Sequence, residues 1–296
     1  MSEVGWTSSA TAVRATLDVM ELSNGRIPVP ANLTGTMIEI GCNGHNLAWD
    51  TPFGVKGIDG IEQHLPISQQ SHVFLISFEP LLDKYAQYLS IQSGQLHEQE
   101  MRDNTLWNRV EQPNPAGWSV PGRAIVLPFA VGAPEGTADF HVAQSDGCSS
   151  LLPMDVERNL DFRARGRNWM VGFMKRLCGR SAAVRRVPVV SLGTVLERWL
   201  PDRPIDYLRV DAQGYDLRVI QSAPPKALAR VQALELEVTS SDLRLPYGGA
   251  DSCLEVVGNL SSLGFRPRRK DGKPFDRACE AKGWHGSVVF VRRRRV

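Results

Sequence analysis

Short apolar runs alternate with helical patterns along most of this chain, and this alternation restricts its fold more than any other feature. The runs that have the length and apolar content of buried strands lie at 36–40, 72–78, 205–211 and 231–238. Helical spacing follows Tyr215 and recurs at 252–264, where a glycine ends it. Strands that alternate with helices predict an α/β domain with a mostly parallel sheet.

The chain is predicted to form one large domain with an extension. Residues 1–35 carry apolar side chains at helical spacing and are predicted to form an N-terminal helical extension. Residues 36–296 are predicted to form a single domain, with insertions at about 90–122 and 154–186, where the strand and helix pattern is interrupted.

Two further segments have patterns of their own. The apolar segment 123–132 and the alternating segment 137–143 flank a turn, so they are predicted to pair as a hairpin. Within 154–186, Trp169, Phe173 and Leu177 are spaced for one face of a helix. Such a helix would either pack on the core or cover a site as a lid.

The composition is that of an ordinary globular protein. A chain of 296 residues with 42% hydrophobic and 22% charged residues can bury about three quarters of its unfolded surface, so fibrous and disordered classes are excluded. Its five cysteines are scattered and form no C-x-x-C pair, so neither a disulfide framework nor a zinc knuckle is expected. With no apolar stretch of about 20 residues, we expect no transmembrane segment. The odd number of scattered cysteines favours a reducing compartment, so we expect a cytoplasmic location.

Positive charge is concentrated in two places although the net charge is only +2. Residues 158–186 are rich in arginine with a single acid, Asp161, and the chain ends in RRRRV. These segments either form a solvated face or contact phosphates, RNA or an anionic membrane surface.

The first apolar run ends abruptly in small residues, which indicates a ligand-binding turn. Gly41 and Gly44 follow this run, and Glu79 follows the next one. In dinucleotide sites a glycine turn lets backbone N–H groups approach the ligand, and an acid at the tip of the second strand accepts the ribose hydroxyls. The alternatives are a plain turn for the glycines and a helix N-terminal charge for Glu79.

The spacing between the turn and this acid leaves other candidates for the ribose. Glu79 lies farther from Gly41 than the usual 20 or so residues, so Asp50, Asp59 and Glu62 compete for the role.

A third polar position follows the 205–211 run. Asp211 ends this run and Gly214 follows it, so Asp211 would project into the same cleft if the two strands are neighbours. In the alternative interpretation Asp211 only caps the following helix.

Several motifs, taken in order, resemble one family. They are EIGCNG (39–44), FEP (78–80), FAVGAPEGTADFHV (129–142), GCSSL (147–151), VVSLGTVLERW (189–199), IDYLRVDAQGYDLRVIQSA (205–223) and LELEV (234–238). Together they are similar to FkbM-type methyltransferases, a branch of the class I S-adenosylmethionine-dependent fold. The resemblance implies a Rossmann-like seven-stranded mostly parallel sheet with helices on both faces, S-adenosylmethionine as cofactor, and O-methylation of a small-molecule acceptor.

The chain departs from the family pattern at several positions. Where the family commonly has G-A-N-x-G this chain has GCNGH, with His45 in place of the second glycine. Where the family commonly has K-I-D-V-E-G-x-E it has RVDAQGYD, so Arg209, Gln213 and Asp216 replace a lysine and two glutamates. Gly193 occupies a position that is often aspartate.

The resemblance also implies roles for individual residues. The cofactor-binding candidates are Glu39, Gly41, Cys42, Asn43, Gly44, Phe78, Glu79, Pro80, Phe129, Ala130, Ser149, Ser150 and Asp211. Glu39 and the glycine turn would lie against the amino-acid part of the cofactor, and Glu79 would hold its ribose. Phe78 and Phe129–Ala130 would flank the adenine, and Ser149–Ser150 with Asp211 would border the methionine end.

A hydroxyl acceptor benefits from a general base, and four residues are candidates for it: Asp211, His45, His141 and His285. We expect no metal, although Asp211 with Asp216 or Asp242 would supply ligands to a metal-assisted version.

Two other function classes remain. One is a nicotinamide-dependent oxidoreductase that uses the same turn and acid, and the other is a noncatalytic or RNA-directed phosphate-binding protein. The acceptor and the oligomeric state, a homodimer included, are not readable from the sequence. No nucleic-acid partner is expected, because the chain lacks a basic strand with interleaved aromatic residues of the kind that RNA-binding modules use.

Overall fold

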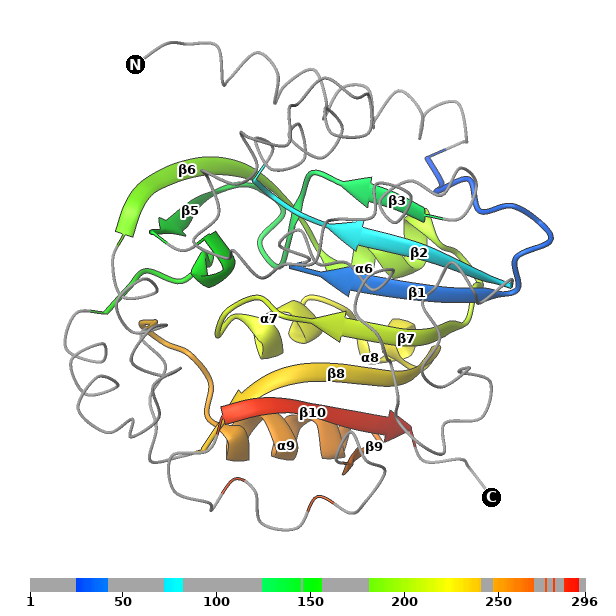
Figure 1. Cartoon of the computed structure of the whole chain (residues 1–296). Helices are drawn as coiled ribbons and strands as arrows, with labels where there is room; N and C mark the ends of the chain where they lie inside the picture. The colour runs from blue at the N-terminus through cyan, green and yellow to red at the C-terminus, as the bar shows by residue number, and fades with distance from the viewer. Residues whose placement is uncertain are drawn as a thin grey trace, which may run out of the picture.

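The main feature of the fold is one seven-stranded sheet with the strand order β3-β2-β1-β7-β8-β10-β9 (Figure 1). The computed structural model describes residues 25–41, 72–81, 124–144, 146–155, 181–240, 247–268, 275, 279 and 285–292. The strands of the main sheet are β1 (Gly35–Ile40), β2 (Val73–Phe78), β3 (Ala124–Leu127), β7 (Ile205–Val210), β8 (Val231–Thr239), β9 (Phe265–Arg268) and β10 (His285–Arg292).

The central strands are parallel and deeply buried. β1 pairs in parallel with β2 and β7, and β7 pairs in parallel with β8, whereas β10 runs antiparallel to both β8 and β9. Every residue of β1 and β2 is buried, which explains why these strands are nearly continuous apolar runs instead of alternating ones. The predicted α/β class is confirmed.

The order of the strands reverses beside β1, which makes this position a topological switch point. The chain moves from β1 outward to β2 and β3, and it later returns to place β7 on the other side of β1. In open α/β sheets such a reversal opens a crevice at the carboxyl ends of the strands, where ligands bind. The topology therefore identifies the carboxyl ends of β1 and β7 as the place to look for a site.

A second, three-stranded sheet has the order β4-β6-β5. Its strands are β4 (Ala130–Val131), β5 (Gly136–Ala143) and β6 (Ser181–Val190). The predicted hairpin is wrong, because β4 and β5 each pair with β6, and β3 pairs with β2 in the main sheet. A strand far along the chain lies between the two segments, and local alternation cannot reveal such a partner.

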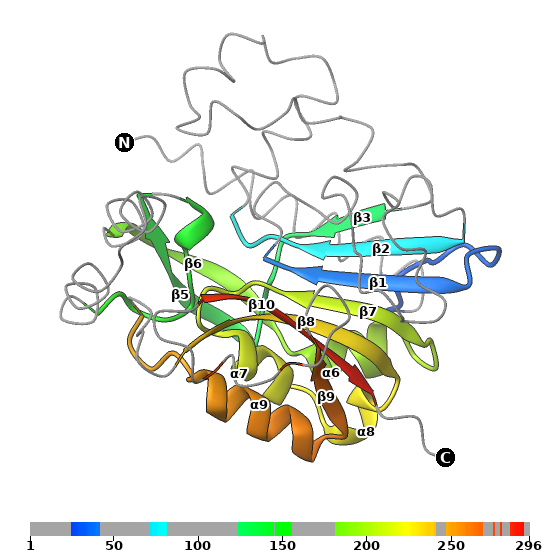
Figure 2. The same ribbon diagram turned by 60° about the horizontal axis from the view of Figure 1, so that its bottom comes forward.

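The described helices are α6 (Leu192–Thr194), α7 (Asp216–Gln221), α8 (Pro225–Leu228) and α9 (Cys253–Ser262), with a 3-10 turn η1 (Asp146–Cys148) and a π-helical turn η2 (Val195–Trp199). Figure 2 shows α7, α8 and α9 below the main sheet, on one face. The predicted helices after Tyr215 and within 252–264 are confirmed as α7 and α9. Helices on both faces stay a prediction, and none of the helices in the described segments has the length and apolar content needed to cross a bilayer.

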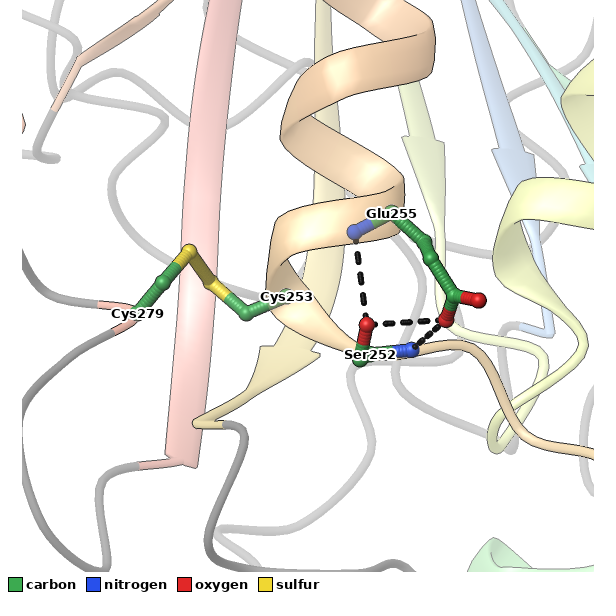
Figure 3. Close-up of a disulfide and its surroundings, with 4 residues drawn as sticks. All are labelled: Ser252, Cys253, Glu255 and Cys279. Carbon is green, nitrogen blue, oxygen red and sulfur yellow. Dashed lines mark hydrogen bonds between the residues drawn. A yellow bond between two sulfur atoms is a disulfide. The ribbon is translucent and has the colours of Figure 1, made fainter.

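The expectation of no disulfide is wrong. Cys253, the first residue of α9, is bonded to Cys279 with a Cα–Cα distance of 5.3 Å across 26 residues of sequence (Figure 3). Cys148 is also disulfide-bonded. Pairing depends on Cα atoms that meet in space, so scattered cysteines without a local motif gave no signal.

Some sequence predictions fall outside the described residues. These are the helix within 1–24, the insertion at 90–122, the lid or core helix around Trp169, and the basic tail. The end of the predicted 154–186 insertion is different from the expectation, because residues from 181 onward belong to β6. Membrane contact through the basic segment, the domain boundaries and the oligomeric state stay predictions.

Candidate functional site

Three strand tips meet at the carboxyl edge of the main sheet. Ile40 of β1 is in register with Phe78 of β2 and with Val210 of β7. The Gly41 N–H donates to the Phe78 carbonyl (3.0 Å), and the Asp211 N–H donates to the Ile40 carbonyl (2.9 Å). The predicted adjacency of Gly41, Glu79 and Asp211 is therefore confirmed, whereas Gly44 lies outside the described residues.

Gly41 is required by the close approach of two strand ends. Its φ is +79°, and a Cβ atom there would lie 2.0 Å from the carbonyl oxygen of Asp211. Any side chain would push the tips of β1 and β7 apart, so glycine keeps this edge of the sheet narrow.

A pocket of about 610 Å³, including the part open to solvent, lies over these tips. The main sheet contributes Ile40, Gly41, Glu79, Pro80, Leu81, Asp211, Ala212, Gln213 and Tyr215, and the small sheet with its flanking turns contributes Phe129, Ala130, Val131, Phe140, Gly147, Ser149 and Leu151. Residues at the edges of the two sheets thus form two walls of the pocket, with the carboxylates on the first wall and mostly apolar side chains on the second. A lining of apolar side chains with a few polar groups is typical of a small-molecule site.

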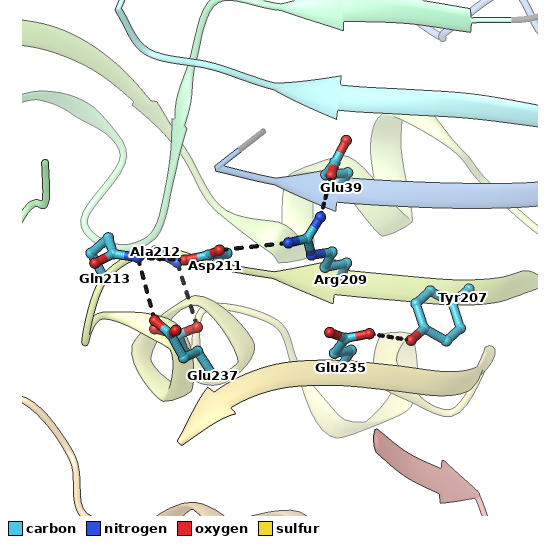
Figure 4. Close-up of polar contacts among 9 residues, drawn as sticks. Glu39, Tyr207, Arg209, Asp211, Ala212, Gln213, Glu235 and Glu237 are labelled. Carbon is cyan, nitrogen blue, oxygen red and sulfur yellow. Dashed lines mark hydrogen bonds and ion pairs between the residues drawn. The ribbon is translucent and has the colours of Figure 1, made fainter. Parts of the chain in front are cut away.

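Asp211 is held in place by two neighbours. The Gln213 amide nitrogen donates to Asp211 Oδ1 (2.6 Å), and the Arg209 guanidinium lies 3.7 Å from Asp211 Oδ2 (Figure 4). The same guanidinium donates to Glu39 Oε1 at 3.0 Å. Arg209 therefore connects a buried acid inside β1 with an acid at the tip of β7.

Glu39 has protein partners of its own. It is 1% exposed, and its carboxylate accepts hydrogen bonds from Arg209 and from the Ser77 hydroxyl (3.3 Å). Its charge is thus compensated within the sheet, so a contact with the amino-acid part of the cofactor, which the resemblance implied, is not needed to satisfy it.

The turn after Asp211 is closed by Asp216. The Gly214 N–H (3.1 Å) and the Ala212 N–H (3.4 Å) donate to its carboxylate. Burial, with repulsion from Asp211 and Glu237, raises the pKa of Asp216 well above 3.8. α7 begins with Tyr215 as N-cap and has no side-chain cap, which rules out the alternative that Asp211 caps this helix.

Seven of the predicted site residues line the pocket: Gly41, Glu79, Pro80, Phe129, Ala130, Ser149 and Asp211. Glu79 is 4% exposed, and its Oε1 accepts a hydrogen bond from the Leu81 N–H (3.0 Å). The Ser149 hydroxyl accepts one from the Ala143 N–H (3.1 Å).

Other predicted residues lie behind the pocket wall. Phe78 is fully buried and stacks on Trp199 with ring centroids 6.4 Å apart, so it belongs to the core and not to the pocket lining. The Ser150 hydroxyl donates to the carbonyls of Ala212 and Gln213, at 3.2 and 3.0 Å, and so supports the Asp211 turn from behind. Glu39, described above, also lies outside the lining.

Of the four base candidates, Asp211 is the one among the described lining residues. His141 lies in β5, where its backbone bridges to Ser150, and it does not line the pocket. His285 begins β10, paired with Thr239, and its side chain is not described. Cys42, Asn43, Gly44 and His45 lie outside the described residues, as do Asp50, Asp59 and Glu62, the alternatives to Glu79.

Sequence reasoning missed several lining residues, chiefly Leu81, Phe140, Leu151, Gln213 and Tyr215. Phe140 was readable as one face of an alternating segment, but its place in the pocket lining depends on the pairing of β5 with the unforeseen β6. Tyr215 packs over Gly132, where a Cβ would lie 2.7 Å from its ring, and no local pattern signals that contact.

The described residues include no group of three or more histidine, cysteine or acidic side chains placed to hold a metal ion. The metal-assisted alternative also named Asp242, which lies outside the described residues.

A seven-stranded α/β sheet with a pocket over the carboxyl ends of its central strands defines the class of α/β proteins that bind small molecules at a topological switch point. Residues 63–267 match the family model of the methyltransferase FkbM domain, which is more than half of the chain. The chain belongs to this family and is a methyltransferase, as the motifs suggested. No curated protein matched the chain.

Proposed function

We propose that this methyltransferase uses S-adenosylmethionine and methylates a hydroxyl or carboxyl oxygen of a small molecule. The observation that carries the proposal is the meeting of Gly41, Glu79 and Asp211 at one pocket, from three neighbouring strand tips. The family match supports methyl transfer over the oxidoreductase alternative. The strand order and the parallel central strands support the class I, Rossmann-like version of the fold.

The chemistry of the pocket fits this cofactor. Gly41 has no side chain at the point where two strand tips come together, so a ligand can lie directly against the backbone at the edge of the sheet. The charged side chains in the described lining are Glu79 and Asp211, both acids. They complement a ligand with a sulfonium and an ammonium, whereas the pyrophosphate of a nicotinamide dinucleotide calls for cationic or N–H-rich surroundings.

The ribose contact is assigned to Glu79. Its carboxylate lies at the tip of β2 beside the pocket, and the Leu81 N–H donates to one of its oxygens. This bond holds the carboxylate in one orientation, and a carboxylate held in this way is suited to accept hydrogen bonds from a vicinal diol.

When bound, S-adenosylmethionine supplies an electrophilic methyl group, and the protein has to align the acceptor with it. Phe129, Phe140 and Leu151, from the small sheet and its flanking segments, give the pocket an apolar side that disfavours water. Asp211, 29% exposed and fixed by Gln213 and Arg209, is the group we assign to hold the acceptor proton.

The acceptor is proposed to be a small molecule and not a nucleic acid. The acids in the described lining, Glu79 and Asp211, would repel a phosphate backbone.

Isothermal titration calorimetry with S-adenosylmethionine and S-adenosylhomocysteine tests the cofactor assignment, with NAD as comparison. Glu79→Gln keeps the shape and the oxygen that accepts from Leu81 but removes the charge. We expect it to weaken binding about tenfold or more, because hydrogen bonds to charged groups contribute about 1.5–3 kcal/mol.

The matched control is Glu197→Gln, which makes the same change at an exposed position of η2 and should bind as the wild type does. Wild-type protein that binds neither sulfur nucleoside would contradict the proposal.

A further inference from the structure

Gln213 has a backbone conformation that glutamine rarely adopts. Its φ is +53°, in the left-handed region, where Asn, Asp and Gly are the usual residues. An unusual conformation beside a pocket points to contacts that hold it there, and these contacts then suggest what the residue does.

The side-chain amide of Gln213 has three partners, of which Asp211 and Glu237 are drawn in Figure 4 and the third is Tyr247. Its Nε2 donates to Asp211 Oδ1 at 2.6 Å and to Glu237 Oε2 of β8 at 3.3 Å. Its Oε1 accepts from the Tyr247 hydroxyl at 3.0 Å. The opposite amide orientation would place an oxygen against two carboxylates, so the contacts fix one orientation.

Tyr247 anchors the far side of the amide. It is 1% exposed, and its hydroxyl also lies 2.8 Å from the Cys148 carbonyl oxygen. Burial, together with the charges of Glu237, Asp211 and Asp216, raises the pKa of Tyr247 well above 10.0, so it remains a neutral donor.

We propose that Gln213 is a positioning residue, whose amide sets the Asp211 carboxylate toward the pocket and separates it from Glu237. This inference rests on the proposed function. An amide can donate to both acids at once, whereas the glutamate that the resembling family commonly carries at this position would add a third carboxylate. The donated hydrogen bonds offset the repulsion between the two carboxylates next to Gln213.

The test is Gln213→Glu, which changes the amide to a carboxyl of the same shape and leaves the backbone position unchanged. The charged and titratable groups around it are Asp211, Glu237, Asp216, Tyr247 and Arg209. Three carboxyls within hydrogen-bonding distance cannot all ionise, so the pKa of the cluster rises.

The expected result is a new pH dependence. Binding of S-adenosylhomocysteine, measured by calorimetry from pH 6 to pH 8.5, should be about tenfold weaker than wild type at the alkaline end and approach wild type at the acidic end. A proton on the introduced carboxyl restores the donor to Asp211, and loss of that proton removes it. Wild type should show no such change.

A second readout needs no ligand. Because the introduced carboxyl has a raised pKa in the folded protein, the folded state holds more protons than the unfolded chain, and stability is lost as pH rises through that pKa. The melting temperature of the variant should therefore fall relative to wild type as pH rises. Gln221→Glu, the same substitution on α7 outside the pocket lining, is the control and should leave both readouts unchanged.

The outcomes are distinguishable. A wild type that binds no S-adenosylhomocysteine contradicts the proposed function, whereas a Gln213→Glu protein whose binding and melting follow the wild-type pH response overturns the positioning role. An equal loss at every pH also overturns it, since that is the signature of a purely structural residue. If this variant does not fold, Tyr247→Phe decides: it should weaken binding about threefold or more, and unchanged binding would refute the proposal.

Discussion

At the scale of single residues, Gly41 sets the geometry of the pocket edge. Its φ is positive, and only 2.0 Å would separate a Cβ atom from the Asp211 carbonyl oxygen, so there is no room for a side chain. The tips of β1 and β7 are joined by the hydrogen bond from the Asp211 N–H to the Ile40 carbonyl. A side chain at position 41 that forced the two tips apart would also break this bond at the edge of the pocket.

Gly41→Ala is therefore expected to lower the free energy of unfolding by about 2 kcal/mol or more, and to weaken S-adenosylhomocysteine binding. Urea unfolding and calorimetry measure the two effects. Gly258→Ala is the matched control: Gly258 is exposed in α9 with no heavy atom within 4 Å of a Cβ, so alanine should raise stability by about 0.5–1 kcal/mol. Equal stability of the two variants would refute this account of Gly41.

The sequence predicted the residues that end strands and missed those that depend on tertiary contacts. Gly41, Glu79 and Asp211 follow apolar runs, and such positions share one edge of a parallel sheet. Gln213 was noted only as a departure from a family motif, because its three partners come from separate segments. Phe78 was assigned to the adenine from its place in a motif, but its side chain points into the core.

At the scale of elements, α9 shows which features are encoded locally. Ser252 and Glu255 form a capping box, in which each side chain binds the other's backbone N–H (Figure 3). Gly264, with φ +87°, follows the end of the helix. The signals for the start and for the end of α9 each lie within a few residues of sequence, so the prediction of this helix is confirmed. The β4 and β5 pairing failed because β6 lies more than 35 residues farther along the chain.

Ser252→Ala should lower the free energy of unfolding by about 1 kcal/mol near neutral pH, because one orphan N–H of the helix loses its acceptor. Ser261→Ala, at an exposed position of the same helix, should stay within about 0.5 kcal/mol of wild type.

The capping box also makes the loss of stability in Ser252→Ala depend on pH. Hydrogen bonds from the Ser252 N–H and hydroxyl lower the pKa of Glu255 below 4.5. A lowered carboxyl pKa stabilises the folded state above the unfolded pKa, and this contribution is lost as pH falls through the folded value. Urea unfolding at pH 7 and pH 3 should show the gap between wild type and Ser252→Ala narrowing in acid, and a gap that widens would contradict the box.

At the scale of the whole molecule, the disulfide joins the start of α9 to the segment before β10. Both sulfur-bearing residues are buried, at 0% and 5% exposure. A persistent disulfide is typical of oxidising compartments, whereas the scattered, odd number of cysteines favoured a reducing one. The cytoplasmic location stays a prediction.

Replacing Cys253 and Cys279 together by alanine should lower the free energy of unfolding by about 3 kcal/mol under oxidising conditions, since a 26-residue separation closes a loop of moderate size. A reductant breaks this bond together with the disulfide of Cys148, so the double variant should lose less thermal stability on reduction than wild type does. Peptide mapping without reduction checks the linkage, and free thiols at both positions would contradict it.

The division of the pocket between two sheets has a consequence for how such an enzyme changes its selectivity. Gly41 and Asp211 belong to the hydrogen-bonded ladder of the main sheet, whereas Phe140, Ser149 and Leu151 come from the small sheet and its turns. A new side chain on the second wall reshapes the hollow and breaks no main-sheet ladder bond. Directed evolution toward other acceptors is therefore best confined to that wall.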